Sequence, residues 1–284
     1  MTKTVRVVAP DWQAGGKPTY FFGSNLLSWL APDNENQKEI KLDVTRPEED
    51  PLEKENGVIA QSSVKRNVTM AADALKQELP DKVITLGGNC LVSQAPFDYL
   101  HGKYGDDLGV LWIDAHPDIS TPKIEEREHA MVLGNLLGAG DPELAKEVQA
   151  PFAPSSFLYV GIQEPNDLEK EELDRLNLNY TVQEDKVIDV EEIQKWIKEN
   201  HFSKIAVHVD LDVLDPSIFY SQYFAEPRVT EFPAEHGRMT PEKLVEILTG
   251  VFQNNEVVGL TIAEYLPWDA VYLKNTLAKL DIFK

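Results

Sequence analysis

Two short apolar runs that each end in carboxylates constrain this chain more than any other feature. The first block reads Trp112-Ile-Asp-Ala-His-Pro-Asp118, and the second reads His208-Val-Asp-Leu-Asp-Val-Leu-Asp-Pro216. Side chains alternate in direction along a strand, so residues two apart point to the same face. Within each block the polar side chains should therefore converge; they are Asp114, His116 and Asp118 in the first, and Asp210 and Asp212 in the second. Oxygen and imidazole donors gathered at two strand ends predict a site for a pair of hard divalent metal ions.

The rest of the chain alternates apolar runs with helix-like stretches. Several runs are continuously apolar, which is typical of strands buried on both faces of a parallel sheet. We expect strands at Val5–Ala9, Lys82–Leu86, Leu108–Ile113, Phe157–Gly161, Lys204–Val209 and Val257–Ala263. We expect helices at Val64–Glu78, Leu91–Tyr99, Val190–Asn200, Pro241–Phe252 and roughly Asp269–Leu280. This alternation predicts a single α/β domain over residues 1–284, with three α/β/α layers and a mostly parallel central sheet.

Capping residues and polar stretches refine this prediction. Asp189 is expected to cap the helix that begins at Val190, and Thr240 the helix that begins at Pro241. The polar stretch Asp33–Asn56 is the best candidate for an exposed excursion. Pro216–Thr240 lacks periodicity and directly follows the second aspartate block, so we expect a long loop that shapes the site.

Composition narrows the class of partner and compartment. The net charge of −21 argues against nucleic acid and anionic membranes as partners, and it favours a cationic small molecule. No apolar run approaches the ~20 residues needed to span a bilayer. The first residues lack a signal-peptide core, so we expect a cytoplasmic protein. Cys90 is the single cysteine, which rules out an intrachain disulfide.

Charge balance supports the metal hypothesis. Two divalent ions carry four positive charges. The four negative charges come from Asp114, Asp118, Asp210 and Asp212, with neutral His116 completing the shell. Without a cation these carboxylates would repel one another strongly. Carboxylate-rich coordination suits Mn²⁺ better than zinc or copper. Two such ions ~3.5–4 Å apart can activate a shared water molecule.

These blocks give the chain a resemblance to the ureohydrolases, the family of arginases, agmatinases and formiminoglutamases. Asp114-Ala-His-Pro-Asp118 is similar to the family motif D-A-H-x-D, and Asp210-Leu-Asp-Val-Leu-Asp-Pro216 to D-x-D-x-x-D-P. Gly87-Gly-Asn-Cys90 stands where the family has G-G-[DE]-H, and Glu264 stands where a glutamate follows the last core strand. The resemblance implies an arginase-like fold, and family members are commonly trimers or hexamers.

The resemblance also implies roles for the aspartate blocks. Asp114 and Asp210 would bridge both metals. Asp118 would complete the shell of the first metal, and His116 and Asp212 that of the second.

Three further positions match residues that act on the substrate. Glu264 would bind the guanidinium, because a carboxylate matches that planar fork bidentately. His129 aligns with a mobile histidine thought to pass a proton to the leaving amine. Ser120 occupies the place of a substrate-binding Asn, so a strict arginase is not expected. Hydroxide shared by the metals would cleave a guanidino or amidino C–N bond, releasing urea or a related amide and an amine, as in agmatinases and arginases.

The chain departs from the family at its first metal site. Cys90 stands where the family has a histidine ligand, and Asn89 replaces the neighbouring acid. Cys90 could bind directly as a softer ligand and shift the metal preference toward zinc or iron, or it could stand off while water completes a weakened first site. The first site could also be empty; we favour a weakened or altered first site that still binds metal. The alternative function is therefore a silent relative that binds a guanidinium ligand or serves as a structural subunit. His208 shares a strand face with Asp210, but we expect it deeper in the sheet, either as a core histidine with satisfied polar atoms or as a residue that supports a metal ligand.

Overall fold

A seven-stranded parallel sheet forms the centre of the structure. The computed structural model describes residues 2–183, 187–280 and 282. The strand order is β2-β1-β5-β9-β8-β6-β7, and every neighbouring pair runs parallel. These strands are β1 (Thr4–Ala9), β2 (Lys38–Lys41), β5 (Lys82–Gly87), β6 (Leu108–Ile113), β7 (Phe157–Val160), β8 (Lys204–Asp210) and β9 (Val257–Ala263). A separate antiparallel pair consists of β3 (Lys54–Glu55) and β4 (Val58–Ile59).

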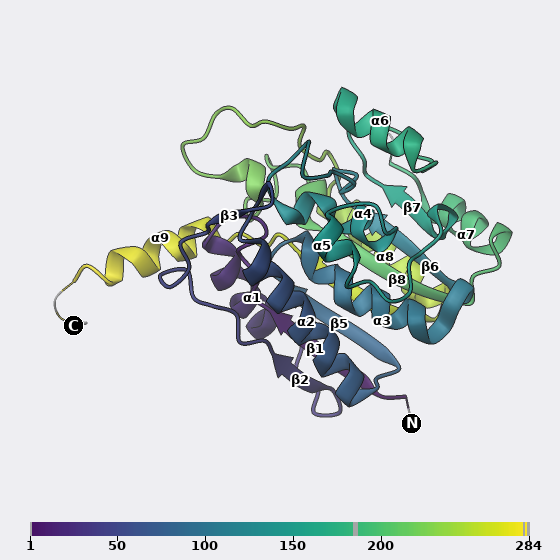
Figure 1. The fold of residues 1–284 in the computed structure, drawn as a ribbon, viewed down its shortest axis with the longest axis horizontal. Coiled ribbons are helices and arrows are strands. Elements are labelled where there is room, and N and C mark those ends of the chain that lie inside the picture. The colour runs from purple at the N-terminus through teal and green to yellow at the C-terminus, as the bar shows by residue number, and fades with distance from the viewer. Residues whose placement is uncertain (1, 184–186, 281, 283–284) are drawn as a thin grey trace.

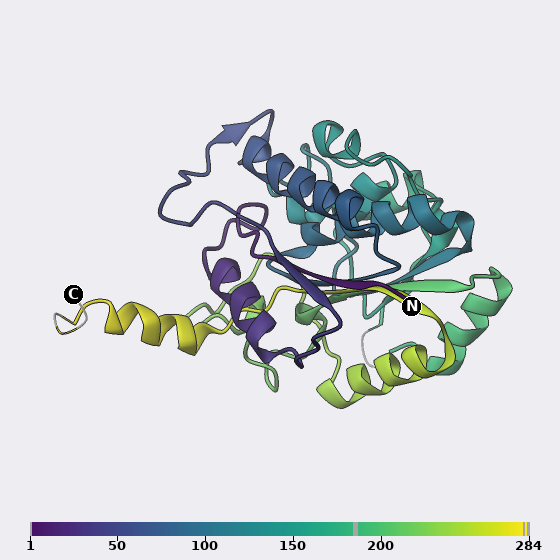
Figure 2. The same ribbon diagram turned by 90° about the horizontal axis from the view of Figure 1, so that it is seen from below.

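Helices cover both faces of the sheet (Figure 1). They are α1 (Thr19–Leu30), α2 (Gln61–Glu78), α3 (Gln94–Tyr104), α4 (Val132–Leu136), α5 (Pro142–Ala145), α6 (Asp167–Arg175), α7 (Val190–Glu199), α8 (Pro241–Asn254) and α9 (Trp268–Leu277). Figure 2 shows the sheet edge-on, with α2 and α3 on one face and α1, α7 and α8 on the other. The predicted three-layer α/β/α architecture is confirmed. In the part of the chain that the structure describes, none of the helices combines the length and apolarity that crossing a bilayer requires.

Two apolar clusters hold these layers together. On one face Leu75, Phe97 and Leu100 of α2 and α3 are buried, and on the other Ile193 of α7 and Ile247 of α8 are buried. Every residue of β6 is buried, which explains why its sequence is continuously apolar. Burying one such large side chain stabilises a fold by roughly 1.5–3 kcal/mol. The aspartates at the ends of β6 and β8 are thus carried by strands that are almost completely buried.

The predictions for the strands, for the two helix caps and for the loop after β8 are confirmed. Each of the six expected strands is present, with its ends within one residue of those expected. Asp189 accepts from the Glu192 N–H at 2.9 Å, and Thr240 accepts from the Lys243 N–H at 3.2 Å, so both predicted caps are confirmed. The loop expected at 216–240 is also present, interrupted by one short 3₁₀ turn.

The expectation for Asp33–Asn56 is partly wrong. This stretch contains the edge strand β2, which pairs with β1 through a register of Val7 to Ile40. The strand was missed because an edge strand exposed to water carries charged side chains, here Lys38, Glu39 and Lys41. The expected helix start at Leu91 is a 3₁₀ turn, Cys90–Ser93, that leads into α3.

Candidate metal centre

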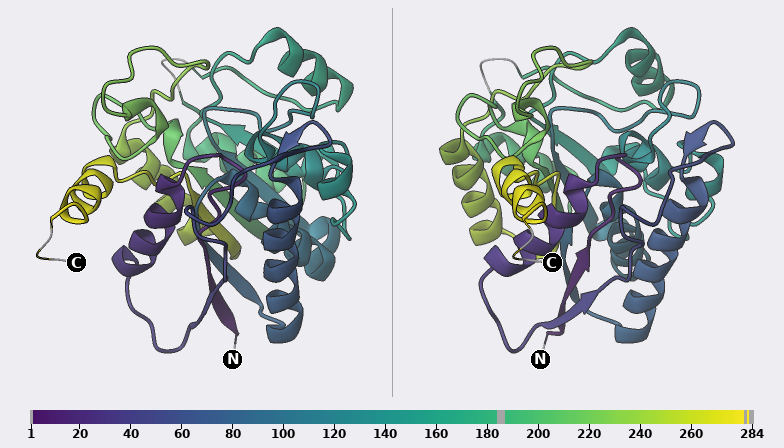
Figure 3. Two further views of the ribbon diagram at one scale, coloured as in Figure 1. Left: turned by 60° about the vertical axis from the view of Figure 1, so that its left-hand side comes forward. Right: turned by 90° about the vertical axis from the view of Figure 1, so that its left-hand side faces the viewer.

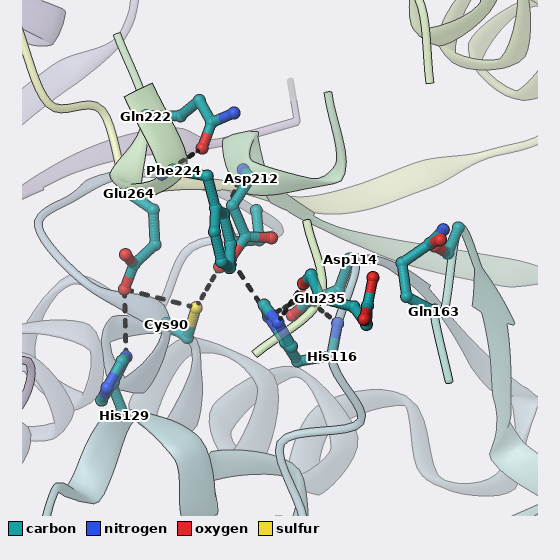
Figure 4. A network of polar contacts seen from close by, with 12 residues as sticks. Cys90, Asp114, His116, His129, Gln163, Asp212, Gln222, Phe224, Glu235 and Glu264 are labelled. Carbon is teal, nitrogen blue, oxygen red and sulfur yellow. Dashed lines mark hydrogen bonds and ion pairs between the residues drawn. The ribbon is translucent and has the colours of Figure 1, made fainter. Parts of the chain in front are cut away.

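The candidate site lies where four adjacent strands end. Strands β5, β9, β8 and β6 are neighbours in the sheet, and in a parallel sheet their carboxyl ends share one edge. Cys90 lies in the turn after β5, Glu264 directly follows β9, Asp210 ends β8, and Asp114 directly follows β6. Figure 4 shows Cys90, Asp114 and Glu264 with the side chains that surround them.

A first donor group contains sulfur, nitrogen and oxygen. Cys90, Asp114, His208 and Asp210 each offer one atom, all within 4.8 Å of one another, and all four residues are buried. Cys90 Sγ lies 2.8 Å from Asp210 Oδ2, and His208 Nε2 lies 3.7 Å from Asp114 Oδ2. The predicted partners Asp114 and Asp210 are therefore brought together, and Cys90 reaches Asp210 from the turn after β5.

A second donor group contains Asp114, His116 and Asp212. His116 Nδ1 lies 3.1 Å from Asp212 Oδ2 and 3.7 Å from Asp114 Oδ1. The opposite ring nitrogen, Nε2, lies 3.0 Å from the Glu235 carbonyl, which can only accept. Burial opposes protonation of His116, but Asp212 raises the pKa of this imidazole well above its usual value. A metal ion that displaced the Nδ1 proton would find the Nδ1 lone pair directed at the carboxylates, while Nε2 still donates to the carbonyl. Asp114 belongs to both donor groups.

Glu264 and His129 form a third group with Cys90. Glu264 Oε1 lies 3.1 Å from His129 Nδ1 and 3.8 Å from Cys90 Sγ. The other carboxylate oxygen, Oε2, accepts from the Tyr20 hydroxyl. Glu264 and His129 are thus placed together, as the resemblance implied. Tyr20 was missed, because a tyrosine at the start of a helix with no motif around it carries no signal of this contact.

Two predicted site residues lie outside the three donor groups. Asp118 is buried, but in the described part of the chain it belongs to no group of metal donors. Its backbone carbonyl accepts from the Leu133 and Gly134 N–H groups, so the residue also fixes the loop after β6. Ser120 is likewise buried, and its N–H donates to the Ala130 carbonyl at 2.9 Å.

The backbone at two site positions adopts a conformation that side chains disfavour. Asp118 has φ 52° and Glu264 has φ 65°, both in the left-handed region. Such a backbone conformation costs on the order of 1–3 kcal/mol of folding free energy, and it persists where the surrounding structure fixes it. The Glu264 N–H donates to the Gly88 carbonyl at 2.7 Å. A Cβ at Gly88 would lie 1.7 Å from the Asp11 carbonyl, so glycine is needed where this turn meets Glu264.

Asn89 supports the turn that carries Cys90. Its Nδ2 donates to the carbonyl and to the side chain of Asp11 at 3.0 and 3.1 Å, and its Oδ1 accepts from the Leu91 N–H at 3.0 Å. Asn89 therefore acts on the shape of the turn.

Burial and mutual repulsion dominate the electrostatics of the site. Burial raises the pKa of Asp114 and Asp210, and the charge of Asp212 raises both further. Burial opposes ionisation of Asp212 too, but the neighbouring His116 holds the pKa of Asp212 below its usual value. Burial and then Asp210 raise the pKa of the Cys90 thiol. A divalent cation would offset this repulsion and favour the ionised ligands.

Unpartnered polar atoms show that these residues fit a metal ion. Asp212 Oδ1 and His208 Nε2, which belong to the donor groups, are buried without a hydrogen-bond partner among the described residues. Most buried polar atoms in proteins do have partners. Burial also lowers the pKa of His208 to about 3, which keeps its imidazole neutral. His208 is buried as expected, but the expectation that its polar atoms are satisfied is wrong, because Nε2 faces the donor group.

Comparisons with known proteins show the family and the fold of this chain. The sequence model of the arginase family matches residues 38–276. An arginase from Entamoeba histolytica is 26% identical over 152 residues, which are 50% of this chain and 51% of that protein, so the match spans about half of that relative's length. A crystal structure of arginase from Entamoeba histolytica has a TM-score of 0.75 at 18% identity and covers 94% of this chain and 92% of its own. Arginase from Bacillus caldovelox has a TM-score of 0.76 at 16% identity and covers 99% of both chains. The match of the arginase family model to residues 38–276, which are most of the sequence, shows that the chain belongs to the arginase family.

Proposed function

We propose that this protein is a metal-dependent hydrolase that cleaves a guanidino or amidino C–N bond. The products are urea, or a related amide, and an amine. The observation that carries the proposal is the position of the Glu264–His129 pair beside two metal-donor groups that share Asp114. A carboxylate for the cation, a histidine for the proton and a metal centre for the water are the three parts that such a hydrolysis needs.

Two divalent ions would be held by Asp114 together with His116 and Asp212 on one side, and with Cys90 and Asp210 on the other. When bound, they supply Lewis-acid activation of a water molecule near neutral pH. Mn²⁺ is proposed for the side that contains His116, because its donors are oxygen and imidazole.

Glu264 binds and orients the guanidinium. Its carboxylate has about four acceptor positions. Tyr20 occupies one on Oε2 and His129 faces Oε1, so acceptor positions remain for a planar cation. Because Glu264 is only 2% exposed, the cation would be desolvated there, and the charge pair would be stronger than at a surface. His129 is placed to donate a proton to the departing amine.

A polar cavity supports a cationic substrate. It has a volume of about 280 Å³, and its lining includes His116, Glu164, Glu169 and Glu235. Lys170 is paired with Glu164 at 2.6 Å, so the acidity comes mainly from the other two carboxylates. An acidic wall beside the metal centre favours a linear guanidino compound with a second positive charge, such as agmatine. The net charge of −21 favours the same class of molecule.

Enzyme assays on the purified chain test the proposal. The protein is stripped of metal, reloaded with Mn²⁺ or Zn²⁺, and incubated with agmatine, arginine, guanidinobutyrate and formiminoglutamate. We expect metal-dependent release of urea or amide, fastest with agmatine. Absence of turnover with all four compounds, while two ions per chain are bound, would contradict the proposal.

A second candidate is a silent relative that binds a guanidinium without cleaving it. It is favoured by Cys90, whose thiol donates to Asp210, and by the two internal partners of Glu264. Calorimetry with agmatine separates the candidates. Binding without turnover, together with near-zero metal content after addition of Mn²⁺, supports the silent protein.

We also propose that the chain forms a homo-oligomer. Helix α9 extends away from the body of the molecule (Figure 3). Its apolar side chains Tyr272, Leu273 and Leu277 are 67%, 57% and 39% exposed. Light scattering after size exclusion checks this: a trimer or hexamer is expected, and a monomer at all concentrations would contradict it.

A further inference from the structure

We infer that His208 and Cys90 complete the first metal site, together with Asp114 and Asp210, and that this site selects Zn²⁺ over Mn²⁺. The inference relies on the proposed function only for the presence of a metal, and it does not depend on the reaction. It assigns a ligand role to His208, and it makes the two sites different in kind.

The His208 ring is held in a fixed orientation. In the sheet, His208 of β8 lies opposite Trp112 of β6, and the two rings stack with centroids 3.8 Å apart at 11°. His208 Nδ1 lies 2.8 Å from Ser93 Oγ. With the Nδ1 proton donated to that hydroxyl, the lone pair lies on Nε2, which is the arrangement that metal-binding histidines use.

His208 Nε2 is directed at the donor group and has no other partner. It is fully buried, and none of the described residues offers it a hydrogen bond. Leaving a buried polar atom unsatisfied costs about 1–3 kcal/mol. A cation bound by Nε2 would remove that cost. Its distance of 3.7 Å from Asp114 Oδ2 is close to the ~3.3 Å that separates two ligands placed ~2.0–2.1 Å from one tetrahedral ion.

Cys90 supplies the fourth donor and sets the metal preference. Its Sγ lies 2.8 Å from Asp210 Oδ2, to which the thiol now donates. Metal binding would release the thiol proton to solvent and leave a thiolate ligand. One thiolate, one imidazole and two carboxylates are a donor set for tetrahedral zinc, whereas Mn²⁺ prefers oxygen. The group of Asp114, His116 and Asp212 contains no sulfur and keeps the manganese preference.

Cobalt binding to the whole chain tests the inference, because Co²⁺ is a spectroscopic substitute for zinc. The metal-stripped protein should take up two ions. The more tightly bound one should show a sulfur-to-cobalt charge-transfer band and the intense visible bands of a tetrahedral ion. Cys90→Ser should abolish the charge-transfer band. His208→Gln should keep that band, change the visible bands and lower the affinity for this ion at least ~10-fold. Loss of a residue that only supports a metal ligand already costs about 10-fold in affinity, so loss of the ligand itself should cost no less.

His101→Gln is the matched control, because His101 is also a buried histidine stacked on an aromatic ring, Phe152, at 3.9 Å. It should bind cobalt as the wild type does. An unchanged affinity and visible spectrum in His208→Gln would overturn the inference. If that variant does not fold, Ser93→Ala serves instead, since it removes only the hydroxyl that orients the ring. An affinity for the first cobalt ion that is ~10-fold lower would then support the inference, and an unchanged affinity would overturn it.

Zinc competition tests the metal preference. We expect Zn²⁺ to displace Mn²⁺ from one site more readily than from the other, and equal displacement would contradict the inference. A chain that shows the cobalt signature but cleaves no guanidino compound would refute the proposed function and leave this inference standing. Turnover of a guanidino compound, with no effect of His208→Gln on metal binding, would refute this inference and leave the proposed function standing.

Discussion

Replacing Glu264 with glutamine removes the charge that we propose binds the guanidinium and leaves the size of the side chain unchanged. The glutamine oxygen can still accept from the Tyr20 hydroxyl, which the wild-type carboxylate contacts through Oε2. The substitution therefore tests recognition of the cation with little disturbance of the position, whose backbone is held by Gly88.

The size of the effect follows from burial. Glu264 is 2% exposed, so water cannot replace the lost charge. Removing one partner of a buried, hydrogen-bonded charge pair costs about 2–5 kcal/mol. At ~1.36 kcal/mol per factor of ten, kcat/KM should fall roughly 30- to 5000-fold.

The assay measures kcat/KM for the fastest guanidino substrate in the metal-loaded enzyme, with metal content determined for each variant. Glu256→Gln is the matched control, because Glu256 precedes the same strand β9 at its opposite end and pairs with Lys204. The control should leave kcat/KM nearly unchanged. Nearly wild-type kcat/KM in Glu264→Gln, or an equal loss in Glu256→Gln, would refute the role of Glu264.

Three further predictions concern the metal ions and the stability of the fold. Asp114→Asn should remove both ions, since Asp114 belongs to both donor groups, and loss of only one by elemental analysis would argue against a shared ligand. Cys90→His should raise the affinity for Mn²⁺ relative to Zn²⁺, measured by competition, and an unchanged ratio would show that the sulfur does not set the preference. Burial first, and then the charge of Asp141, raises the pKa of Glu128 to about 8. Its contribution to stability is therefore complete below the unfolded pKa near 4.5 and is lost as pH rises through about 8. As pH rises from about 5 to about 9, the melting temperature of Glu128→Gln should rise relative to that of the wild type. A difference in melting temperature that stays constant with pH would contradict this.

The order of the strands along the chain was predictable because buried parallel strands must be continuously apolar. β6 is of this kind throughout, β8 and β9 are so over most of their length, and all three were expected within one residue. β2 and α6 were not expected, because an exposed edge strand and a largely solvent-facing helix carry charged residues in place of an apolar pattern. Caps such as Asp189 were predictable from the sequence because the cap and the N–H group that it accepts from are only three residues apart.

The site was predictable where its residues follow each other in one strand. Asp210 and Asp212 share a motif, so their common face follows from the alternation along the strand. His208 shares that face, but the sequence does not show that Trp112 and Ser93 orient its ring, since they come from other elements. Tyr20 meets Glu264 across 244 positions of sequence, a contact that only the packed structure reveals.

Anomalous diffraction from crystals grown with zinc and manganese tests the metal centre most directly. Two peaks are expected at the carboxyl edge of the sheet, both next to Asp114. Zinc should lie among Cys90, His208 and Asp210, and manganese beside His116 and Asp212. Absence of any peak at this edge, in a crystal whose protein is folded and exposed to both metals, would contradict the account.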